Sequence, residues 1–294
     1  MNYELKVMET EPPVEKLKLA IVGKEKHGKS RLAASGRKNV LVHDFDNRSE
    51  SLQGIKGVFV VSYPDPQWPN QPEAAQKFLD VLGRLEETLD LSKFGDLIKG
   101  ADKLPSPTII RTNVIDSVAT FGKAFQNYAL STVKDIRREI NFGKMKVFLP
   151  GGWDAWNAEM VPVENNILRA LALPSDTIIV LHETAEESAD STSEKPKFTG
   201  RTGVFPVRYQ RLIKYFNEVW RVKLTQVVED GKAFYRPIVY PLPTYEFDAA
   251  SAMLLDQTEA SNIEAMIAKH ELRLKQKNLL SATPTKALPA GVKI

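Results

Sequence analysis

Short apolar runs alternate with helical patterns through the first two-thirds of the chain. Runs rich in β-branched and aromatic residues, bounded by Gly, Pro or charged residues, predict buried strands. The predicted strands lie at residues 16–22, 39–45, 57–63, 108–115 and 176–181. Apolar residues recur at helical spacing between these runs. The corresponding helices are predicted to begin at residue 29 and to cover residues 73–89, 118–141 and 157–172. This alternation predicts an α/β fold with a mainly parallel central sheet flanked by helices.

The last third of the chain has a different pattern. Two runs at residues 218–228 and 233–240 flank the turn sequence EDGK, which predicts a β-hairpin that adds antiparallel strands at one edge of the sheet. Residues 207–216 predict a short helix, and residues 249–280 predict a long, polar-rich helical segment. Residues 183–206 carry Gly, Ser, Thr, Pro and charge without periodicity, which predicts a long loop. A loop of that length in a compact domain is usually functional or disordered.

Composition and turn signals divide the chain into four predicted segments. A Pro-Pro dipeptide ends an N-terminal arm at residues 1–15, because it removes two backbone donors. Residues 16–245 are predicted to form one core, followed by a C-terminal helical segment at residues 246–280. Residues 281–294 have the composition of a disordered tail.

The bulk composition is that of an ordinary soluble globular protein. Apolar residues make up 43% and charged residues 26% of the 294 residues, and the net charge is +3. The chain has no cysteine, which excludes disulfides, thiolate zinc sites and cysteine nucleophiles. The N-terminus has no secretory pattern, and no apolar run reaches the roughly 18 residues that a spanning helix needs. We therefore expect a cytoplasmic protein with no membrane partner.

A phosphate-binding loop is the most specific motif in the sequence. Residues 23–30 read GKEKHGKS and match G-x-x-x-x-G-K-[ST] in full, between a predicted strand and a predicted helix. Glycines allow the backbone to approach phosphate closely, and successive amide groups face the anion. The motif predicts that Lys29 reaches the β- and γ-phosphates of ATP and that Ser30 ligates Mg²⁺. The nucleotide-binding candidates are Gly23, Lys24, Glu25, Lys26, His27, Gly28, Lys29, Ser30 and Arg31.

Acidic residues follow two of the predicted strands. Asp116 ends an apolar strand and is followed by Ser117, which suits a carboxylate that holds Mg²⁺ opposite the phosphate loop. The alternative role for Asp116 is to cap the next helix. Asp44 and Asp46 lie two residues apart, so their side chains are expected on the same side of the strand. Asp46 is the candidate for polarising the attacking water, and the alternative is that both are solvated loop acids.

A histidine and a glutamate end the strand at residues 176–181. The carboxyl ends of parallel strands meet at one edge of a sheet, so His182 and Glu183 are expected near the nucleotide. A polar group there suits a sensor of the γ-phosphate that passes its state to the following loop. The alternative is a strand-end histidine whose hydrogen bonds are satisfied within the fold.

The predicted loop changes charge along its length. Residues 183–194 contain acids without Lys or Arg, whereas residues 195–223 contain eight cations against one acid, with aromatic residues interleaved. Cations with stacking rings are what single-stranded nucleic acid binding needs. Lys195, Lys197 and Arg201 are the candidates for contacting DNA, and Arg201 also suits an arginine finger on a neighbouring subunit's ATP. The alternative is a solvated face in which the aromatic residues belong to the core.

Together these motifs resemble RecA-like recombinase ATPases, in particular the short phage-encoded recombinase and single-strand annealing ATPases. The resemblance rests on GKEKHGKS, VLVHDFD, VIDSVATF and IIVLHE, in this order, followed by VFPVRYQRLIKYFNEVWRV, and it covers about residues 16–240. It implies a RecA-like P-loop core with ATP and Mg²⁺ as ligands. Lys29 and Ser30 match the phosphate-loop pair and Asp116 the magnesium acid, while Asp46 stands where bacterial recombinases usually have Glu.

The resemblance also implies partners. Proteins of this kind bind single-stranded DNA and assemble into rings or filaments, with nucleotide at subunit interfaces, and a single-strand-binding protein is a further expected partner. Two other functions stay open at this stage. One is a helicase-like or packaging P-loop motor, and the other is an annealing or mediator module with negligible ATP turnover.

Overall fold

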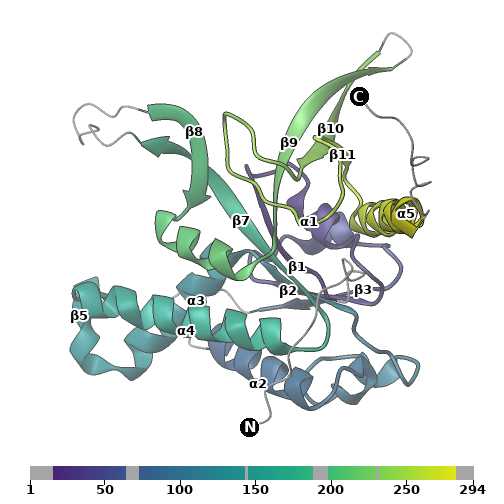
Figure 1. Ribbon diagram of the computed structural model, residues 1–294. Helices are drawn as coiled ribbons and strands as arrows, with labels where there is room; N and C mark the ends of the chain where they lie inside the picture. Colours follow the sequence, from purple (N-terminus) through teal and green to yellow (C-terminus); the bar gives the residue numbers. More distant parts are fainter. Residues whose placement is uncertain (1–15, 64–72, 143–144, 188–197, 230–231, 283–294) are drawn as a thin grey trace, which may run out of the picture.

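A nine-stranded sheet forms the centre of the molecule, with helices on both faces (Figure 1). The structure is a computed structural model that describes residues 16–63, 73–142, 145–187, 198–229 and 232–282. The strands follow the order β11-β10-β9-β1-β7-β4-β2-β3, and β8 pairs with β7 outside this path. The sheet consists of β1 (Lys18–Gly23), β2 (Val40–Asp44), β3 (Val58–Ser62), β4 (Thr112–Asp116), β7 (Asp176–Glu187), β8 (Phe198–Phe205), β9 (Glu218–Glu229), β10 (Lys232–Tyr240) and β11 (Glu259–Ala260).

Most neighbouring strands of this sheet are parallel. Strand β1 pairs with β7 and β9, β4 pairs with β7 and β2, and β2 pairs with β3, all in parallel. Strands β9 and β10 form the predicted antiparallel hairpin at one side of the sheet. The structure thus confirms the mainly parallel α/β sheet and its antiparallel edge, and both fit a P-loop ATPase fold.

Five α-helices cover the two faces of the sheet. They are α1 (Lys29–Ala33), α2 (Glu73–Glu87), α3 (Val118–Thr132), α4 (Trp153–Ala172) and α5 (Ile263–Ala282). Helices α2, α3 and α4 lie on one face, and α1 and α5 lie on the other (Figure 1). Within the described residues, none of the helices combines the length with the apolar character that spanning a bilayer would require.

Each face of the sheet has its own hydrophobic core. Along β1, Ala20 and Val22 belong to one core, whereas Leu19 and Ile21 belong to the other. This alternation follows from the two-residue period of a strand, and it explains why the central strands are apolar throughout.

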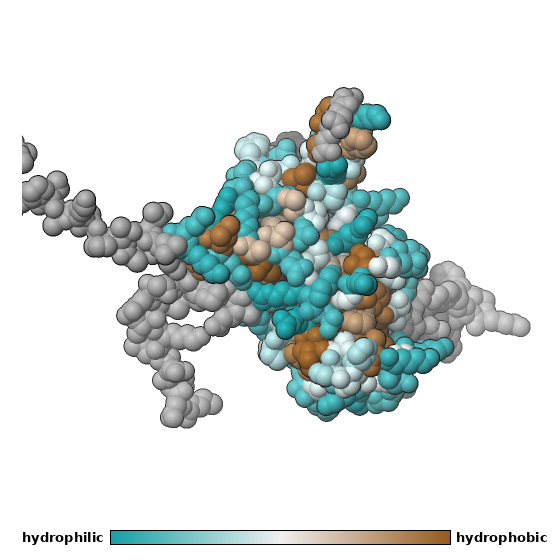
Figure 2. All heavy atoms as spheres, turned by 90° about the vertical axis from the view of Figure 1, so that its right-hand side faces the viewer, coloured by the Kyte–Doolittle hydropathy of each residue, from teal (hydrophilic) through white to brown (hydrophobic). Residues whose placement is uncertain are grey.

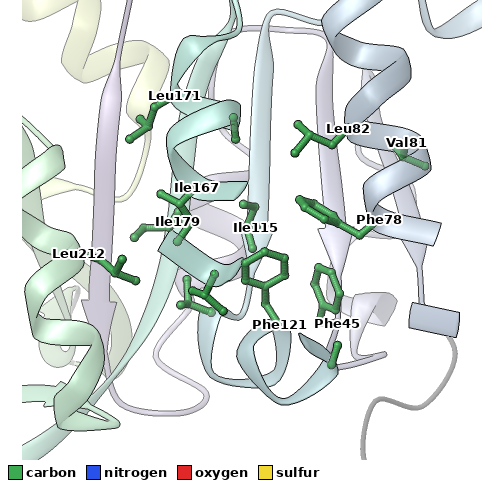
Figure 3. Close-up of a cluster of buried hydrophobic side chains, with 14 of the residues drawn as sticks. Phe45, Phe78, Val81, Leu82, Ile115, Phe121, Ile167, Leu171, Ile179 and Leu212 are labelled. Carbon is green, nitrogen blue, oxygen red and sulfur yellow. The ribbon is translucent and has the colours of Figure 1, made fainter. Parts of the chain in front are cut away.

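The larger core holds the start of α3 against the end of β2. Phe121 of α3 contacts Phe45, with ring centroids 5.1 Å apart, and Phe78 of α2, with centroids 4.9 Å apart (Figure 3). Edge-to-face aromatic contacts of this kind are favourable and specific in geometry. They position the residues that follow β2 and β4 relative to one another.

Three predicted elements differ from the structure. The predicted helix at residues 118–141 ends at Thr132, and a separate antiparallel hairpin of β5 (Arg137–Phe142) and β6 (Met145–Pro150) follows. The guanidinium of Arg137 donates to the carbonyl groups of Leu130 and Ser131, near the end of α3. A side-chain donor therefore satisfies helix carbonyls at the point where the chain turns away.

The predicted loop at residues 183–206 is largely a β-hairpin. Strand β7 continues to Glu187 and pairs in antiparallel fashion with β8, with His182 opposite Phe205. The pairing satisfies backbone groups that a loop would leave to water. The candidates Lys195 and Lys197 lie outside the described residues.

The C-terminal helix is shorter than the predicted segment at residues 249–280. Helix α5 begins at Ile263, because the Asn262 side chain accepts the backbone N–H of Ala265 as an N-terminal cap. The preceding chain is irregular except for β11. The predicted short helix at residues 207–216 is the 3-10 helix η5 (Val207–Tyr215). The proposed arm at residues 1–15 and nearly all of the tail at residues 281–294 lie outside the described residues.

Two hairpins, β7–β8 and β9–β10, project beyond the carboxyl end of the sheet (Figure 1). The β9–β10 hairpin exposes Leu224, Val228, Phe234 and Tyr235. Figure 2 shows hydrophobic side chains beside its tip. The sequence pattern alone does not distinguish such exposed apolar positions from core positions.

Candidate functional site

The carboxyl ends of four parallel strands bring the predicted motifs together. Gly23 at the end of β1 lies opposite His182 of β7, and Asp44 at the end of β2 lies opposite Asp116 of β4. A cavity of about 670 Å³ opens at this edge, which is a size typical of small-molecule sites. It is lined by Glu25, Lys26, Gly28, Lys29, Ser30, Arg31, Val42, Asp44, Asp46, Arg48, Ser49, Ser51, Leu52, Asp116 and His182.

The phosphate loop is held in shape by its own contacts. The buried Lys29 ammonium donates to the carbonyl groups of Gly23, at 2.8 Å, and Lys24, at 2.6 Å. Gly28 has φ +85°, in the left-handed region that favours glycine. A side chain at Gly23 would come within 2.5 Å of the Val222 carbonyl oxygen, so only glycine permits this approach of β1 to β9.

Burial disfavours the charged form of the Lys29 side chain. It lowers the pKa of Lys29, and the nearby Asp116 carboxylate opposes that effect. The charged form of Lys29 is therefore stabilised by negative charge at this position. Phosphate groups would supply such charge.

A serine and two carboxylates meet on the other side of the cavity. The Ser30 side chain hydrogen bonds to the buried Asp116, and burial together with the Asp46 and Asp44 charges raises the pKa of Asp116 to about 6. Asp46 accepts a hydrogen bond from the Ser117 hydroxyl at 3.1 Å and another from the Thr120 hydroxyl. These two bonds orient the Asp46 carboxylate beside Asp116.

Some of the buried polar atoms without a hydrogen-bond partner lie at this edge. They include His182 Nδ1 and Asp44 Oδ2. Burial and the Lys29 charge both lower the pKa of His182, so its imidazole is neutral at pH 7. Buried polar atoms normally have a hydrogen-bond partner, and those that do not are often found where a ligand binds.

Some predicted site residues lie away from the cavity. Glu183 does not line it, although its charge acts on the pKa of both Lys29 and Arg221. His27 faces β9 instead, where its Nδ1 accepts the backbone N–H of Leu224 at 3.4 Å. The backbone of Arg201 lies in β8, and its side chain is outside the described part of the structure.

The cations that follow the predicted loop are largely compensated by the fold. Arg208 pairs with the buried Glu159 at 2.7 Å, and Arg211 pairs with Glu164 at 2.8 Å. Lys223 pairs with Glu246. The sequence count of eight cations against one acid missed these partners, because they come from distant elements. Phe216 and Trp220 are buried and Tyr215 packs half-buried against the core, which confirms the core interpretation for these three aromatic residues. Tyr209 is buried as well.

Several residues of the site were not predicted, among them Arg48, Ser117 and Thr120. Arg48 lines the cavity beyond β2 and is exposed, and its guanidinium lies 4.0 Å from the Glu25 carboxylate. Ser117 and Thr120 hold Asp46, as described above. The available signals were the cation two residues after Asp46 and the hydroxyl residues one and four positions after Asp116.

The residues present fit a magnesium nucleotide. No group of three or more His, Asp or Glu that could hold a metal occurs among the described residues. Mg²⁺ commonly takes one or two protein oxygens and completes its shell with phosphates and water. The Ser30 hydroxyl and Asp116 carboxylate are such oxygens, and the raised pKa of Asp116 indicates a carboxylate that a cation would stabilise.

Comparison with known proteins agrees with this geometry. No curated protein matches the chain. A family model described as an AAA domain matches residues 15–252, which is most of the chain and includes every residue of the cavity. AAA domains are nucleotide-hydrolysing P-loop ATPases that usually bind nucleotide with Mg²⁺. The chain therefore belongs to the AAA-domain family of P-loop ATPases.

Proposed function

We propose that this chain is an ATP-dependent, single-stranded-DNA-binding ATPase of the RecA-like recombinase type, acting in recombination, annealing or replication. One observation carries the proposal. Strand β7 passes the cavity at His182 and continues directly into the projecting β7–β8 hairpin. A change at the nucleotide thus has a continuous backbone path to the segment proposed to contact DNA.

The residues of the cavity have distinct roles in this proposal. Lys29 neutralises phosphate charge, and Ser30 and Asp116 hold Mg²⁺, which when bound offsets charge on the β- and γ-phosphates. Asp46, oriented by Ser117 and Thr120, positions the attacking water and accepts its proton. The neutral His182 imidazole donates or accepts a hydrogen bond at the γ-phosphate end, and the exposed Arg48 adds a second cation at the cavity.

The DNA-binding part of the proposal rests on the β7–β8 hairpin. Lys195 and Lys197 directly precede β8 in the sequence, and Arg201, which lies within β8, also suits a finger that reaches a neighbouring subunit. We further propose self-association into a ring or filament through the arm at residues 1–15, with a single-strand-binding protein as an additional partner. Arg208 and Arg211 of η5 already pair with Glu159 and Glu164. These ion pairs make η5 a weaker candidate for binding DNA phosphates than the β7–β8 hairpin.

A second candidate function is a DNA-annealing module with negligible ATP turnover. It is favoured by the Asp46 side chain, which is one methylene shorter than Glu and has one oxygen already engaged by two hydroxyl groups. In that function ATP would be a structural ligand that is bound with negligible hydrolysis.

The deciding experiment is steady-state ATP hydrolysis with and without single-stranded DNA at fixed salt. We expect DNA to stimulate hydrolysis, and we expect Lys29→Ala to abolish nucleotide binding and both activities. Lys275→Ala, which changes an exposed lysine on α5, is the matched control and should behave as the unmodified chain. Unchanged nucleotide binding in Lys29→Ala would refute the phosphate cradle. Hydrolysis without stimulation would favour another type of motor, and binding without hydrolysis would favour the annealing module.

The hairpin is tested separately by combining Lys195→Ala, Lys197→Ala and Arg201→Ala. We expect weaker DNA binding and a flatter salt dependence, by about 0.7 in logarithmic slope for each lost phosphate contact. The control combines Lys56→Ala, Lys99→Ala and Lys103→Ala, which remove the same charge from exposed positions away from the hairpin. Equal affinity and slope in the two triple variants would exclude the hairpin from the DNA interface.

A further inference from the structure

A buried glutamate ties η5 to α4. Glu159 of α4 is fully buried, and its Oε1 accepts from the Tyr209 hydroxyl of η5. The same oxygen accepts from the Arg208 guanidinium, whose Nε and Nη2 lie at 2.9 Å and 2.7 Å. Burial and the Glu159 charge raise the pKa of Tyr209, so its hydroxyl keeps the proton that it donates. One carboxylate oxygen therefore holds two side chains of η5 in place.

The Tyr209 hydroxyl also lies against helix α3. A Cβ added at Gly122 of α3 would overlap this hydroxyl and would lie 2.9 Å from Glu159 Oε1. Any other residue at position 122 would therefore push α3 and Tyr209 apart. Glycine is unfavourable in a helix interior, so the close packing of Tyr209 on α3 gives a physical reason for its presence there.

The start of α3 holds Asp46. Thr120 lies two residues before Gly122, and its hydroxyl, like that of Ser117, donates to the Asp46 carboxylate. Two residues span about 3 Å along a helix axis. The contact between Tyr209 and α3 thus lies within one helical turn of a hydroxyl that orients Asp46.

The element that carries Tyr209 is itself anchored. The backbone N–H of Val204 in β8 donates to the Gln210 side chain of η5 at 3.2 Å, and a single residue separates β8 from η5. Leu212 of η5 belongs to the same hydrophobic core as Phe121 of α3 (Figure 3). Tyr209 is therefore supported on both sides, as the precise placement of a catalytic group requires.

We propose that Tyr209 is a positioning residue for ATP hydrolysis. Its hydroxyl, held by Glu159, fixes α3 at Gly122, and α3 in turn orients the Asp46 carboxylate. The inference rests on the proposed role of Asp46 in positioning the attacking water. A misplacement of about 1 Å is enough to lower turnover strongly, so a shift of α3 reduces kcat while the phosphate loop still binds ATP.

The first test compares two tyrosines of η5. Tyr209→Phe removes the hydroxyl that contacts Glu159 and α3, and we expect it to lower kcat about tenfold and to leave KM for ATP within about twofold. Tyr215→Phe is the matched control, because the Tyr215 hydroxyl likewise donates to a carboxylate of α4, that of Glu164, and not to the one beside Gly122. It should leave both constants within about twofold. Urea unfolding measures the folded fraction to which kcat is referred.

The second test approaches the same contact from α3. Gly122→Ala introduces the Cβ that overlaps Tyr209, and we expect kcat to fall by at least about tenfold with KM for ATP within about twofold. Gly83→Ala in α2 is the control, because a Cβ added there has no neighbour within 4 Å, and it should leave kcat within about twofold. Tyr209→Phe removes the overlapping hydroxyl, so the double variant should lose less kcat than the product of the two single effects.

The outcomes separate this inference from the proposed function. We expect Asp46→Asn to lower kcat on the order of 10²-fold or more. If it does so while Tyr209→Phe and Tyr215→Phe have equal kcat, or if Tyr209→Phe changes only KM, then Tyr209 is not a positioning residue and the role of Asp46 stands. If Asp46→Asn hydrolyses ATP as the unmodified chain does, or if the unmodified chain binds ATP without hydrolysis, both are refuted.

Discussion

The two ends of the central sheet bury carboxylates in opposite ways. At the amino end of β9, the buried Glu218 carboxylate accepts from Trp220 Nε1 at 2.8 Å, the Ser251 hydroxyl at 2.6 Å and the Ala252 N–H at 2.9 Å. At the carboxyl end of β4, the buried Asp116 carboxylate has the Ser30 side chain and two further acids, Asp44 and Asp46, as neighbours.

The difference distinguishes structural from functional burial of charge. Burial raises the pKa of both carboxyls, but three donors compensate that of Glu218, whereas like charges add to the cost at Asp116. A fold keeps such an uncompensated group only where something else requires it, and perturbed pKa values cluster at functional sites. The comparison supports the carboxyl end of the sheet as the place where a cationic ligand binds.

The largest expected effect is on catalysis at Asp116. Asp116→Asn removes the charge that we propose holds Mg²⁺, and we expect ATP hydrolysis to fall on the order of 10²-fold or more. The ligand-free chain should become more stable, by about 1–3 kcal/mol at pH 7.5, because the raised pKa means that the charged form costs stability above pH 6. Hydrolysis assays and urea unfolding measure the two effects. A destabilised ligand-free variant would contradict the comparison.

Glu218→Ala should have the reverse signature. The change leaves the Trp220 and Ala252 donors buried without an acceptor, so we expect a loss of about 3 kcal/mol in the free energy of unfolding. ATP hydrolysis per folded molecule should stay within about twofold, because Glu218 does not line the cavity at the carboxyl end of the sheet. A selective loss of turnover without a loss of stability would show that the amino end takes part in function.

The buried His43 extends the comparison to a polar side chain that is neutral when buried. His43 is fully buried, its Nδ1 lies 2.6 Å from the Tyr63 hydroxyl and its Nε2 lies 2.7 Å from Asn113 Oδ1. Burial lowers the pKa of His43 to about 4, so the unfolded chain takes up a proton first as the pH falls. Its contribution to stability is therefore present above pH 6.5 and is lost progressively toward pH 4.

We expect this residue to account for a loss of about 2 kcal/mol between pH 7.5 and pH 5. Urea unfolding of the unmodified chain and of His43→Gln at the two pH values isolates its contribution, since other titrating groups are common to both. A pH dependence that is equal in the two proteins would refute a neutral, buried His43.

The smallest expected effect concerns the phosphate loop backbone. Gly28→Ala places a side chain at φ +85° next to Pro237, so we expect a destabilisation of about 1 kcal/mol and weaker nucleotide binding. Gly54→Ala is the matched control, because Gly54 has φ +78° but no neighbour within 4 Å of an added Cβ. A similar loss of stability in both, with nucleotide binding lost only in Gly28→Ala, would separate backbone strain from contact with the ligand.

Much of the fold could be predicted from local pattern. The five parallel strands of the first two-thirds and the β9–β10 hairpin occur where apolar runs and turn residues predicted them, with ends that differ by a few residues. The β5–β6 hairpin, the extension of β7 beyond Leu181 and its pairing with β8 could not be predicted, because these segments lack a clear two-residue hydrophobic period. Helix α5 begins later than predicted, because Ser251 and Ala252, at the start of the predicted segment, hydrogen bond to the distant Glu218 carboxylate instead of continuing a helix.

By itself the sequence determined the phosphate loop, the central parallel strands and the acid at the end of β4, because each depends on short spacing or on local burial. Only the tertiary structure decided which of these residues meet. It placed Asp46 and Arg48 beside Asp116, turned His27 toward β9 and gave Arg208 and Arg211 their partners on α4. It also brought the start of α5 against the end of α1, where the backbone N–H of Ile263 donates to the Ser35 side chain. The physical reason is that strand order and helix packing, which no local pattern contains, bring together segments that are up to about two hundred residues apart in the chain.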